Sequence, residues 1–221
     1  MLFENKEKRY KTLLIFIIPL IVLLLVFSVL TVSSVFSLFG KTANGPKDTF
    51  DINEYDYHLR ANATDLQKEL FKELQELLAD GTDELAIAES VVKNYVADTY
   101  TWDNKYGQWD IGGMYYVYSP HKSTIYKEIK DKFYGLLDKY QEDYGNKGLL
   151  EVSNIEITES HIGDNLYEVD GNSYKRYTVR CAWEYSDSSR FANKVAHKQY
   201  FKVIKNNDGR YEIVECYGDD Y

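Results

Sequence analysis

The chain has 221 residues, with 26 Lys and Arg against 35 Asp and Glu, which gives a net charge of −9 at pH 7 with His neutral. Four basic and two acidic residues precede an uncharged run at residues 12–40, so the part after it carries a net charge of about −11, a sign that repels nucleic acid and anionic lipid. We therefore expect no direct nucleic-acid binding by that part, whose roughly 180 residues suffice for one domain with its own core.

The uncharged run, TLLIFIIPLIVLLLVFSVLTVSSVFSLFG, is long enough to cross a bilayer, which takes about 20 apolar residues. Residues 1–11 before it contain four basic residues, and positive charge favours the cytoplasmic side. The sequence predicts a cytoplasmic tail (1–11), a transmembrane anchor in the cell membrane (12–40) and a C-terminal domain outside. The alternative is a cleaved signal peptide, but its apolar core would span only about 7–15 residues and end in a small-residue cleavage site.

Residues 41–61 are polar and show no sustained periodicity, which predicts a linker to a domain over residues 62–221. Thr64 with Gln67 three residues later fits the capping pattern of a helix start. Leucines at helical spacing follow as far as Gly81, and a second amphipathic helix is expected to begin after it. Neither helix can bury its apolar face alone, so the two should form a helical hairpin.

Residues 101–118, TWDNKYGQWDIGGMYYVY, are rich in aromatic residues and Gly, and the segment MYYVY is expected to form a short strand. Aromatic faces suit the binding of sugars, peptides and protein partners, but loop aromatics also commonly close the end of a core. Both interpretations stay open at this point. The candidate ligand or partner surface comprises Trp102, Tyr106, Trp109, Tyr115 and Tyr118.

A third helix is expected from Ser119-Pro120 to Tyr144, because Ser before Pro is typical of a helix start. From Glu151 the hydrophobic period changes to two, which predicts about four strands, the last two joined by a tight turn at Asn206–Gly209. No helical pattern separates these strands, so they should pair antiparallel. The fold class is therefore α+β, with three helices on one face of an antiparallel sheet.

Alternating strand residues are expected to face the space between sheet and helices. His197 alternates with Phe201 and could point inward, as a structural residue or as a proton-transfer group. Two cysteines lie in strand-like segments, Cys181 and Cys216, as a disulfide or as two buried free thiols. The expected interior residues are Tyr177, Trp183, His197 and Phe201.

Catalytic and metal-binding patterns give little support to an enzyme. The four His residues are too scattered to predict a metal site, and Asp103 and Asp110 are interpreted as turn formers. We find no Gly-rich phosphate loop, no Gly-x-Ser-x-Gly and no Cys/His pairing. The sequence therefore predicts no catalytic residues, no metal and no cofactor.

The order of these elements over residues 62–217 resembles the nuclear transport factor 2-like fold, a cone formed by a curved sheet wrapped on helices. With the short tail and single span, the layout resembles the membrane-anchored scaffold proteins of bacterial type IV secretion and conjugation machines, as do the runs YQEDYGNKGLLEV and NNDGRYEIVECY. The resemblance implies a non-enzymatic outer domain that contacts other channel proteins or itself. It carries over no functional residue, because no family motif is present.

The sequence therefore leaves two candidate functions. The first is an anchored scaffold for protein–protein assembly, in a conjugation or type IV secretion channel. The second is a surface binding or sensing domain for a small ligand, a peptide or a cell-wall fragment.

Overall fold

The computed structural model describes residues 50–52 and 55–218. The predicted tail and membrane anchor at residues 1–40 lie outside that part of the chain. None of the helices within it is long and apolar enough to cross a membrane. Residues 48–221 form one unit by themselves.

The fold is α+β, as expected. In the described residues the helices are α2 (Asp65–Asp80), α3 (Glu84–Thr99), α4 (Lys122–Lys132) and α5 (Leu137–Tyr144). A four-stranded antiparallel sheet has the order β3-β6-β7-β8, formed by β3 (Val152–Ile162), β6 (Arg176–Tyr185), β7 (Lys198–Lys205) and β8 (Tyr211–Tyr217). Two hairpins pair β1 (Phe50–Ile52) with β2 (Tyr57–Leu59) and β4 (Tyr167–Val169) with β5 (Asn172–Tyr174).

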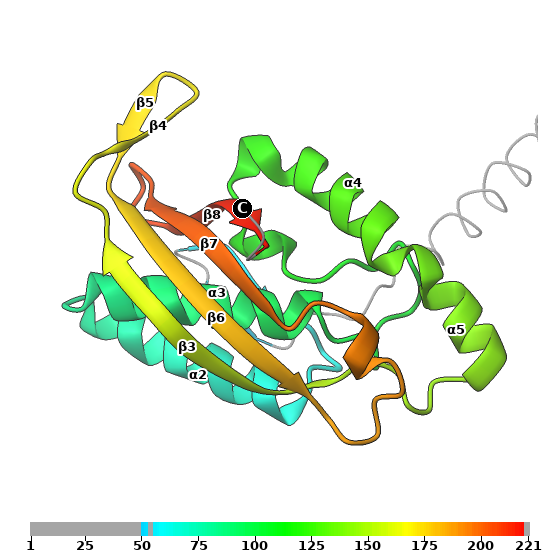
Figure 1. Ribbon diagram of the computed structural model, residues 1–221. Coiled ribbons are helices and arrows are strands. Elements are labelled where there is room, and N and C mark those ends of the chain that lie inside the picture. Colours follow the sequence, from blue (N-terminus) through cyan, green and yellow to red (C-terminus); the bar gives the residue numbers. More distant parts are fainter. Residues whose placement is uncertain (1–49, 53–54, 219–221) are drawn as a thin grey trace, which may run out of the picture. The chain divides into compact units, whose positions relative to one another are not determined.

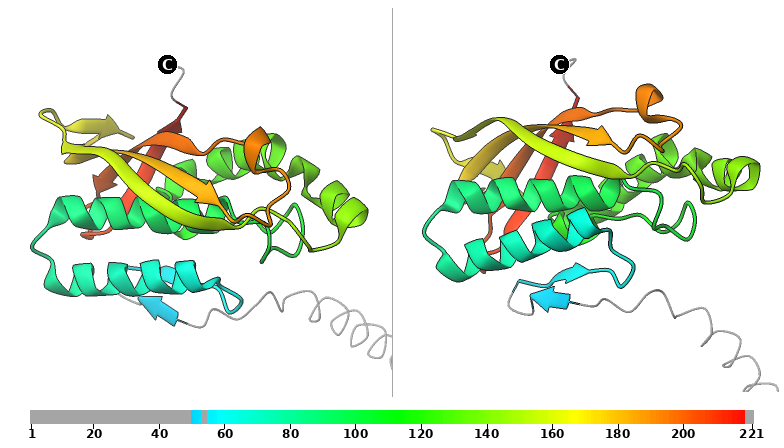
Figure 2. Two further views of the ribbon diagram at one scale, coloured as in Figure 1. Left: turned by 60° about the horizontal axis from the view of Figure 1, so that its bottom comes forward. Right: turned by 90° about the horizontal axis from the view of Figure 1, so that it is seen from below.

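Helix α3 lies between the sheet and α2 (Figures 1 and 2). It contacts all four strands of the sheet as well as α2, and ten of its sixteen residues are buried. A helix covered on both sides is apolar around most of its circumference, which explains why its sequence is less amphipathic than that of α2. In the part of the chain that the structure describes, no helix covers the opposite face of the sheet (Figure 2).

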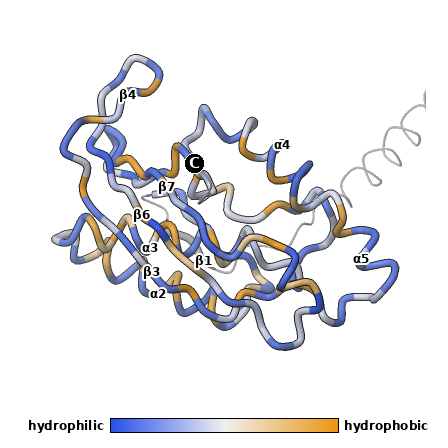
Figure 3. The backbone as a smooth tube through the Cα atoms, viewed as in Figure 1, coloured by the Kyte–Doolittle hydropathy of each residue, from blue (hydrophilic) through white to orange (hydrophobic). Residues whose placement is uncertain are grey.

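Local signals placed the first two helices correctly. The Thr64 hydroxyl accepts a hydrogen bond from the Gln67 backbone N–H, and the Gln67 side chain accepts one from the Thr64 N–H. Gly81 ends α2 with a left-handed φ of 67°, and the side chain of Asp83 caps α3. Figure 3 shows the interleaving of hydrophobic and hydrophilic residues along these elements and the strands.

Two other expectations were wrong in detail. The third helix is broken into α4 and α5 by a short 3-10 turn at Tyr134–Leu136, where Gly135 lowers helix propensity. The expected strand at MYYVY is a 3-10 turn, Met114–Tyr116, followed by a single parallel bridge between Val117 and Ile213.

The predicted linker at residues 41–61 ends too late, because its last residues belong to the domain. Tyr57 is fully buried, and its ring lies 5.2 Å from that of Tyr116. Leu59 is also buried. Polar neighbours concealed this contribution, since the β1–β2 hairpin contributes few apolar side chains to the core.

Aromatic side chains fill the space between sheet and helices. Tyr177 and Phe201 are fully buried and Trp183 nearly so, and the Phe201 ring lies 5.6 Å from that of Tyr95 on α3. His197 was expected there but is exposed, with Nδ1 3.1 Å from the Val195 carbonyl oxygen. It precedes β7, so the inward and outward alternation of that strand does not extend to it.

The two cysteines are free thiols. Cys181 lies on β6 and Cys216 on β8, with β7 between them. Two strand spacings amount to about 10 Å, beyond the reach of a disulfide. Burial raises the pKa of Cys181 to about 12 and that of Cys216 to about 11.

Candidate functional site

The predicted aromatic surface is divided by the fold into separate places. Trp102 is buried, with its ring 4.8 Å from that of Phe133, so it closes the core. Tyr118 is also buried. Tyr115 is 38% exposed and lies against the His58 ring. Only two of the five candidates share an exposed loop tip, namely Tyr106 (56% exposed) and Trp109 (59% exposed).

A network of four charged side chains holds this loop, and we call Arg60, Asp98, Lys105 and Asp110 the ion network. Arg60 donates two hydrogen bonds to the Asp110 carboxylate, at 3.1 and 3.0 Å, and its Nε lies 3.1 Å from Asp98 Oδ1. The Lys105 ammonium, whose side chain is fully buried, donates to the same Asp98 oxygen at 3.1 Å. The network thus links the residue after β2, the end of α3 and both ends of the loop tip.

Asp98 is the centre of the ion network. Burial by itself would raise the pKa of its carboxyl, but Lys105, Arg60 and the backbone N–H of Gly113 lower it to about 2. A carboxylate in the last turn of a helix opposes the helix dipole, so α3 alone would not favour Asp98. An acidic residue is favoured there because Asp98 binds Lys105 and Gly113 and so stabilises the loop.

The chain turns sharply where the loop returns to α3. Gly113 has φ of 80°, and a Cβ there would collide with the Thr99 hydroxyl. A Cβ on Gly112 would collide with the Asp98 backbone. Both positions therefore require Gly.

Helix α5 and its neighbours hold the other side of the loop tip. Asp138 accepts hydrogen bonds from the backbone N–H and the side-chain amide of Gln108, both at 3.0 Å. The Tyr126 hydroxyl donates to the Trp109 carbonyl oxygen at 3.0 Å. Leu136, two residues before Asp138, is 55% exposed. The tip therefore presents its aromatic side chains from a backbone fixed on two sides.

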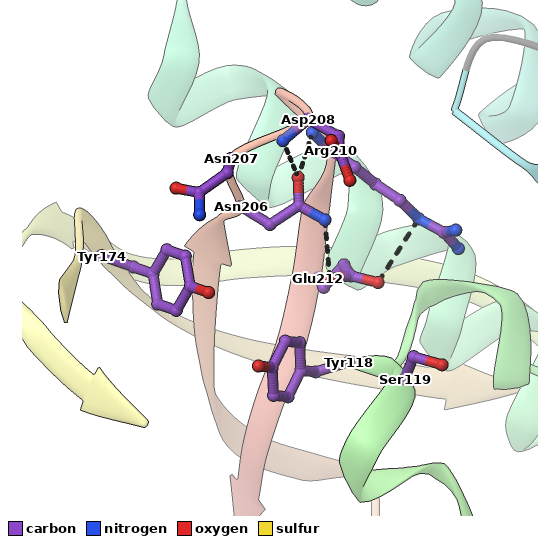
Figure 4. Close-up of a pocket in the computed structure, with 8 residues that line it drawn as sticks. All are labelled: Tyr118, Ser119, Tyr174, Asn206, Asn207, Asp208, Arg210 and Glu212. Carbon is purple, nitrogen blue, oxygen red and sulfur yellow. Dashed lines mark hydrogen bonds and ion pairs between the residues drawn. The ribbon is translucent and has the colours of Figure 1, made fainter. Parts of the chain in front are cut away.

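A second feature is an open cleft of about 340 Å³ at the β7–β8 turn. Figure 4 shows the polar side chains around it, which come from the turn, from β8, from β5 and from the segment before α4. Its lining residues are Tyr118, Ser119, Tyr174, Asn206, Asn207, Asp208, Arg210 and Glu212.

Glu212 is the most buried charged group of this cleft. Its Oε2 accepts a hydrogen bond from the Asn206 amide at 3.0 Å, and its Oε1 lies 3.6 Å from Arg210 Nε. Burial raises the pKa of its carboxyl. The Asn206 side chain also accepts hydrogen bonds from the backbone N–H groups of Asp208 and Arg210. Most of these polar groups therefore stabilise the β7–β8 turn.

The third feature is the sheet face that no described helix covers, whose centre we call the tyrosine face: Arg180, Tyr200, Lys202, Glu215 and Tyr217. The rings of Tyr200 and Tyr217 stack 5.5 Å apart, and Arg180 lies 5.0 Å from the Tyr200 ring. Lys202 pairs with Glu215 at 2.6 Å and lies 5.6 Å from the Tyr217 ring. Tyr and Arg are among the residues enriched at protein–protein interfaces.

Sequence reasoning found the exposed aromatics but missed the ion network and the tyrosine face. Arg60 lay in the predicted linker, and Asp98 looked like a polar residue on a helix. The alternation of apolar and polar residues along β6 and β7 distinguishes the two faces of the sheet. That alternation was the sequence signal that could have indicated the tyrosine face. Among residues 50–52 and 55–218, no three His, Cys, Asp or Glu side chains are grouped to hold a metal ion.

Comparisons of the chain with protein-family models, curated proteins and solved structures gave no match. Functional proposals therefore depend on the chemistry of this chain's own surfaces.

Proposed function

We propose that the chain is a non-enzymatic, single-pass membrane protein whose outer domain is an assembly scaffold. Residues 12–40 would be the anchor, and the domain would be a nuclear transport factor 2-like cone. The type IV secretion and conjugation channels of bacteria, which this layout resembles, are the proposed setting. The α+β order of helices followed by an antiparallel meander supports the proposal.

The observation that carries it is the filled interior. Tyr177 and Phe201 from the sheet meet Tyr95 from α3, and all three are fully buried. Side chains occupy the space in which a hollow cone would hold a ligand. Binding partners should therefore contact the surface of the domain.

The tyrosine face is the proposed docking surface. It offers two stacked rings flanked by cations. Lys202 is paired with Glu215, and the Tyr200 hydroxyl donates a hydrogen bond to Glu159 at 3.4 Å. A partner protein, or a second copy of this chain, could cover such a face without leaving the charge of Lys202 unpaired.

Site-specific crosslinking in the native membrane tests this. A photoreactive phenylalanine analogue at Tyr200 in the full chain is expected to form light-dependent protein adducts. The control carries the analogue at Lys72, an exposed position on α2, on the far side of α3 from the sheet. Arg180→Glu should reduce the Tyr200 adducts several-fold. Equal adducts at both positions, or none at Tyr200, would contradict the proposal.

A second candidate function, the binding of a small polar ligand or cell-wall fragment, is favoured by the open cleft of Figure 4. Its hydroxyl and amide groups suit a saccharide or peptide. Soluble cell-wall fragments titrated calorimetrically into the full chain would bind, and Asn207→Ala would weaken binding while Lys72→Ala would not. Absence of heat at millimolar ligand would eliminate this candidate.

A further inference from the structure

The aromatic loop tip lies beside the point where the chain enters the domain. Phe50, the first described residue, pairs with Leu59 in the β1–β2 hairpin. The next residue, Arg60, bonds Asp110 and the Asn104 carbonyl oxygen within the loop. The entry point and the loop tip are thus joined through one side chain.

The tether between the apolar run and this entry point is short. Nine residues separate Gly40 from Phe50, and a fully extended chain spans at most about 3.6 Å per residue. If residues 12–40 cross the membrane, the entry point lies within about 35 Å of its surface.

The loop tip carries the side chains that membrane interfaces favour. Trp and Tyr concentrate at the headgroup level of bilayers, where the apolar ring contacts acyl chains and the polar N–H or O–H group contacts headgroups or water. Trp109 and Tyr106 are each more than half exposed, and so is Leu136, two residues before the Asp138 that binds the loop backbone at Gln108. The ion network and Asp138 hold the loop backbone before any contact is made, so little ordering is needed on binding.

We propose that Tyr106 and Trp109 rest in the headgroup region of the membrane in which the chain is anchored. This proposal rests on the membrane anchor of the proposed function. The lipid should be zwitterionic, because the exposed side chains of Asp103 and Asp138 flank the tip and the part of the chain after the run is acidic. The contact would fix the orientation of the domain and leave the tyrosine face open to proteins.

The three tryptophans of the chain supply the probe. Trp102 and Trp183 are 1% and 3% exposed, whereas Trp109 is 59% exposed. The full chain would be reconstituted into phosphatidylcholine vesicles with brominated acyl chains, which quench only rings that reach the lipid. We expect lower tryptophan emission than in unbrominated vesicles, and Trp109→Phe should abolish this difference while the emission of the other two remains.

A positional control distinguishes the loop tip from exposure in general. Leu166 is 63% exposed and immediately precedes β4. The β4–β5 hairpin and α5 lie at opposite ends of the domain in Figure 1. Leu166→Trp in the Trp109→Phe background should be quenched by aqueous iodide and not by brominated lipid. If Trp109 behaves in the same way, the proposal is overturned. Protection of Trp109 from iodide only when other membrane proteins are present would overturn it in favour of a protein site.

Flotation and alkaline extraction of the same vesicles separate the two proposals. A chain that resists extraction, but whose Trp109 is not quenched by brominated lipid, keeps its anchor and refutes the loop contact alone. A chain that is released by alkali refutes the anchor and the loop contact together.

Discussion

The carboxylate of Asp98 accepts a 2.7 Å hydrogen bond from the backbone N–H of Gly113, and this bond ties the end of α3 to the return of the aromatic loop. Asp98→Asn keeps an acceptor at this place but removes the charge that Lys105 faces in the interior. We expect a loss of about 3 kcal/mol in the free energy of unfolding. Urea unfolding followed by tryptophan fluorescence measures it, since every tryptophan lies in the domain.

Two variants control this prediction. Asp103→Asn, at an exposed position of the same loop, should change stability by less than about 0.5 kcal/mol. Adding Lys105→Met to Asp98→Asn should restore part of the loss, because the unpaired buried charge is removed. A double variant less stable than Asp98→Asn would show that the charge of Lys105 is not the cause.

Gly113→Ala should destabilise the domain more than Gly171→Ala. Both Gly residues have φ near 80°, so both substitutions impose backbone strain. A Cβ at Gly171 meets open space, whereas at Gly113 it collides with Thr99, which adds about 1–3 kcal/mol. Thermal unfolding of the two variants gives the difference. Equal melting temperatures would mean that the loop does not pack against α3 as described.

Stability should fall on acidification between about pH 4.5 and pH 2. Hydrogen bonds from Lys175, Lys205 and Tyr177 lower the pKa of Glu84 to about 2, and Asp98 is lowered to a similar value. A carboxyl whose folded pKa lies below its unfolded value stabilises the fold above the unfolded pKa and loses that contribution as pH falls toward the folded one. Urea midpoints measured across this range should decrease.

Glu84→Gln is the matched variant for the acid range. It should be less stable than the parent at pH 7 and lose less stability on going to pH 2.5, because one of the linked protonations is gone. The Glu84 side chain keeps 27% exposure, so solvent screening makes its share modest. A parallel pH dependence in parent and variant would argue against the contacts of Glu84 with Lys175 and Lys205.

Neither cysteine should react readily in the folded protein. Burial raises the pKa of both thiols, and the thiolate is the reactive form. Alkylation at pH 8 should therefore be slow for the folded chain and should reach both sites after unfolding in urea. Oxidation of the folded chain should give no intramolecular disulfide. Non-reducing electrophoresis should therefore show no faster-migrating band.

Local patterns in the sequence were sufficient for much of the fold. The capping residues Thr64 and Gln67 and the stop at Gly81 act within one or two helical turns, so α2 could be predicted closely. The same holds for the Asn206–Gly209 turn, whose side-chain bonds are made within the turn itself. The alternation of Tyr177, Val179 and Cys181 marked the buried face of β6 because strand side chains alternate by geometry.

The candidate site could not be predicted from local patterns, because it depends on contacts between residues far apart in the sequence. Arg60 and Asp110 are fifty positions apart, and neither has a neighbour in sequence that indicates the other. Exposure of Trp109 and burial of Trp102 could not be told apart from composition, since both rings lie in one aromatic segment. The sequence by itself determined the class of the fold and its local turns, whereas only the tertiary structure decided which aromatics fill the core and which remain at the surface. Periodicity reports local geometry, and burial of a loop residue depends on which distant segments pack against it.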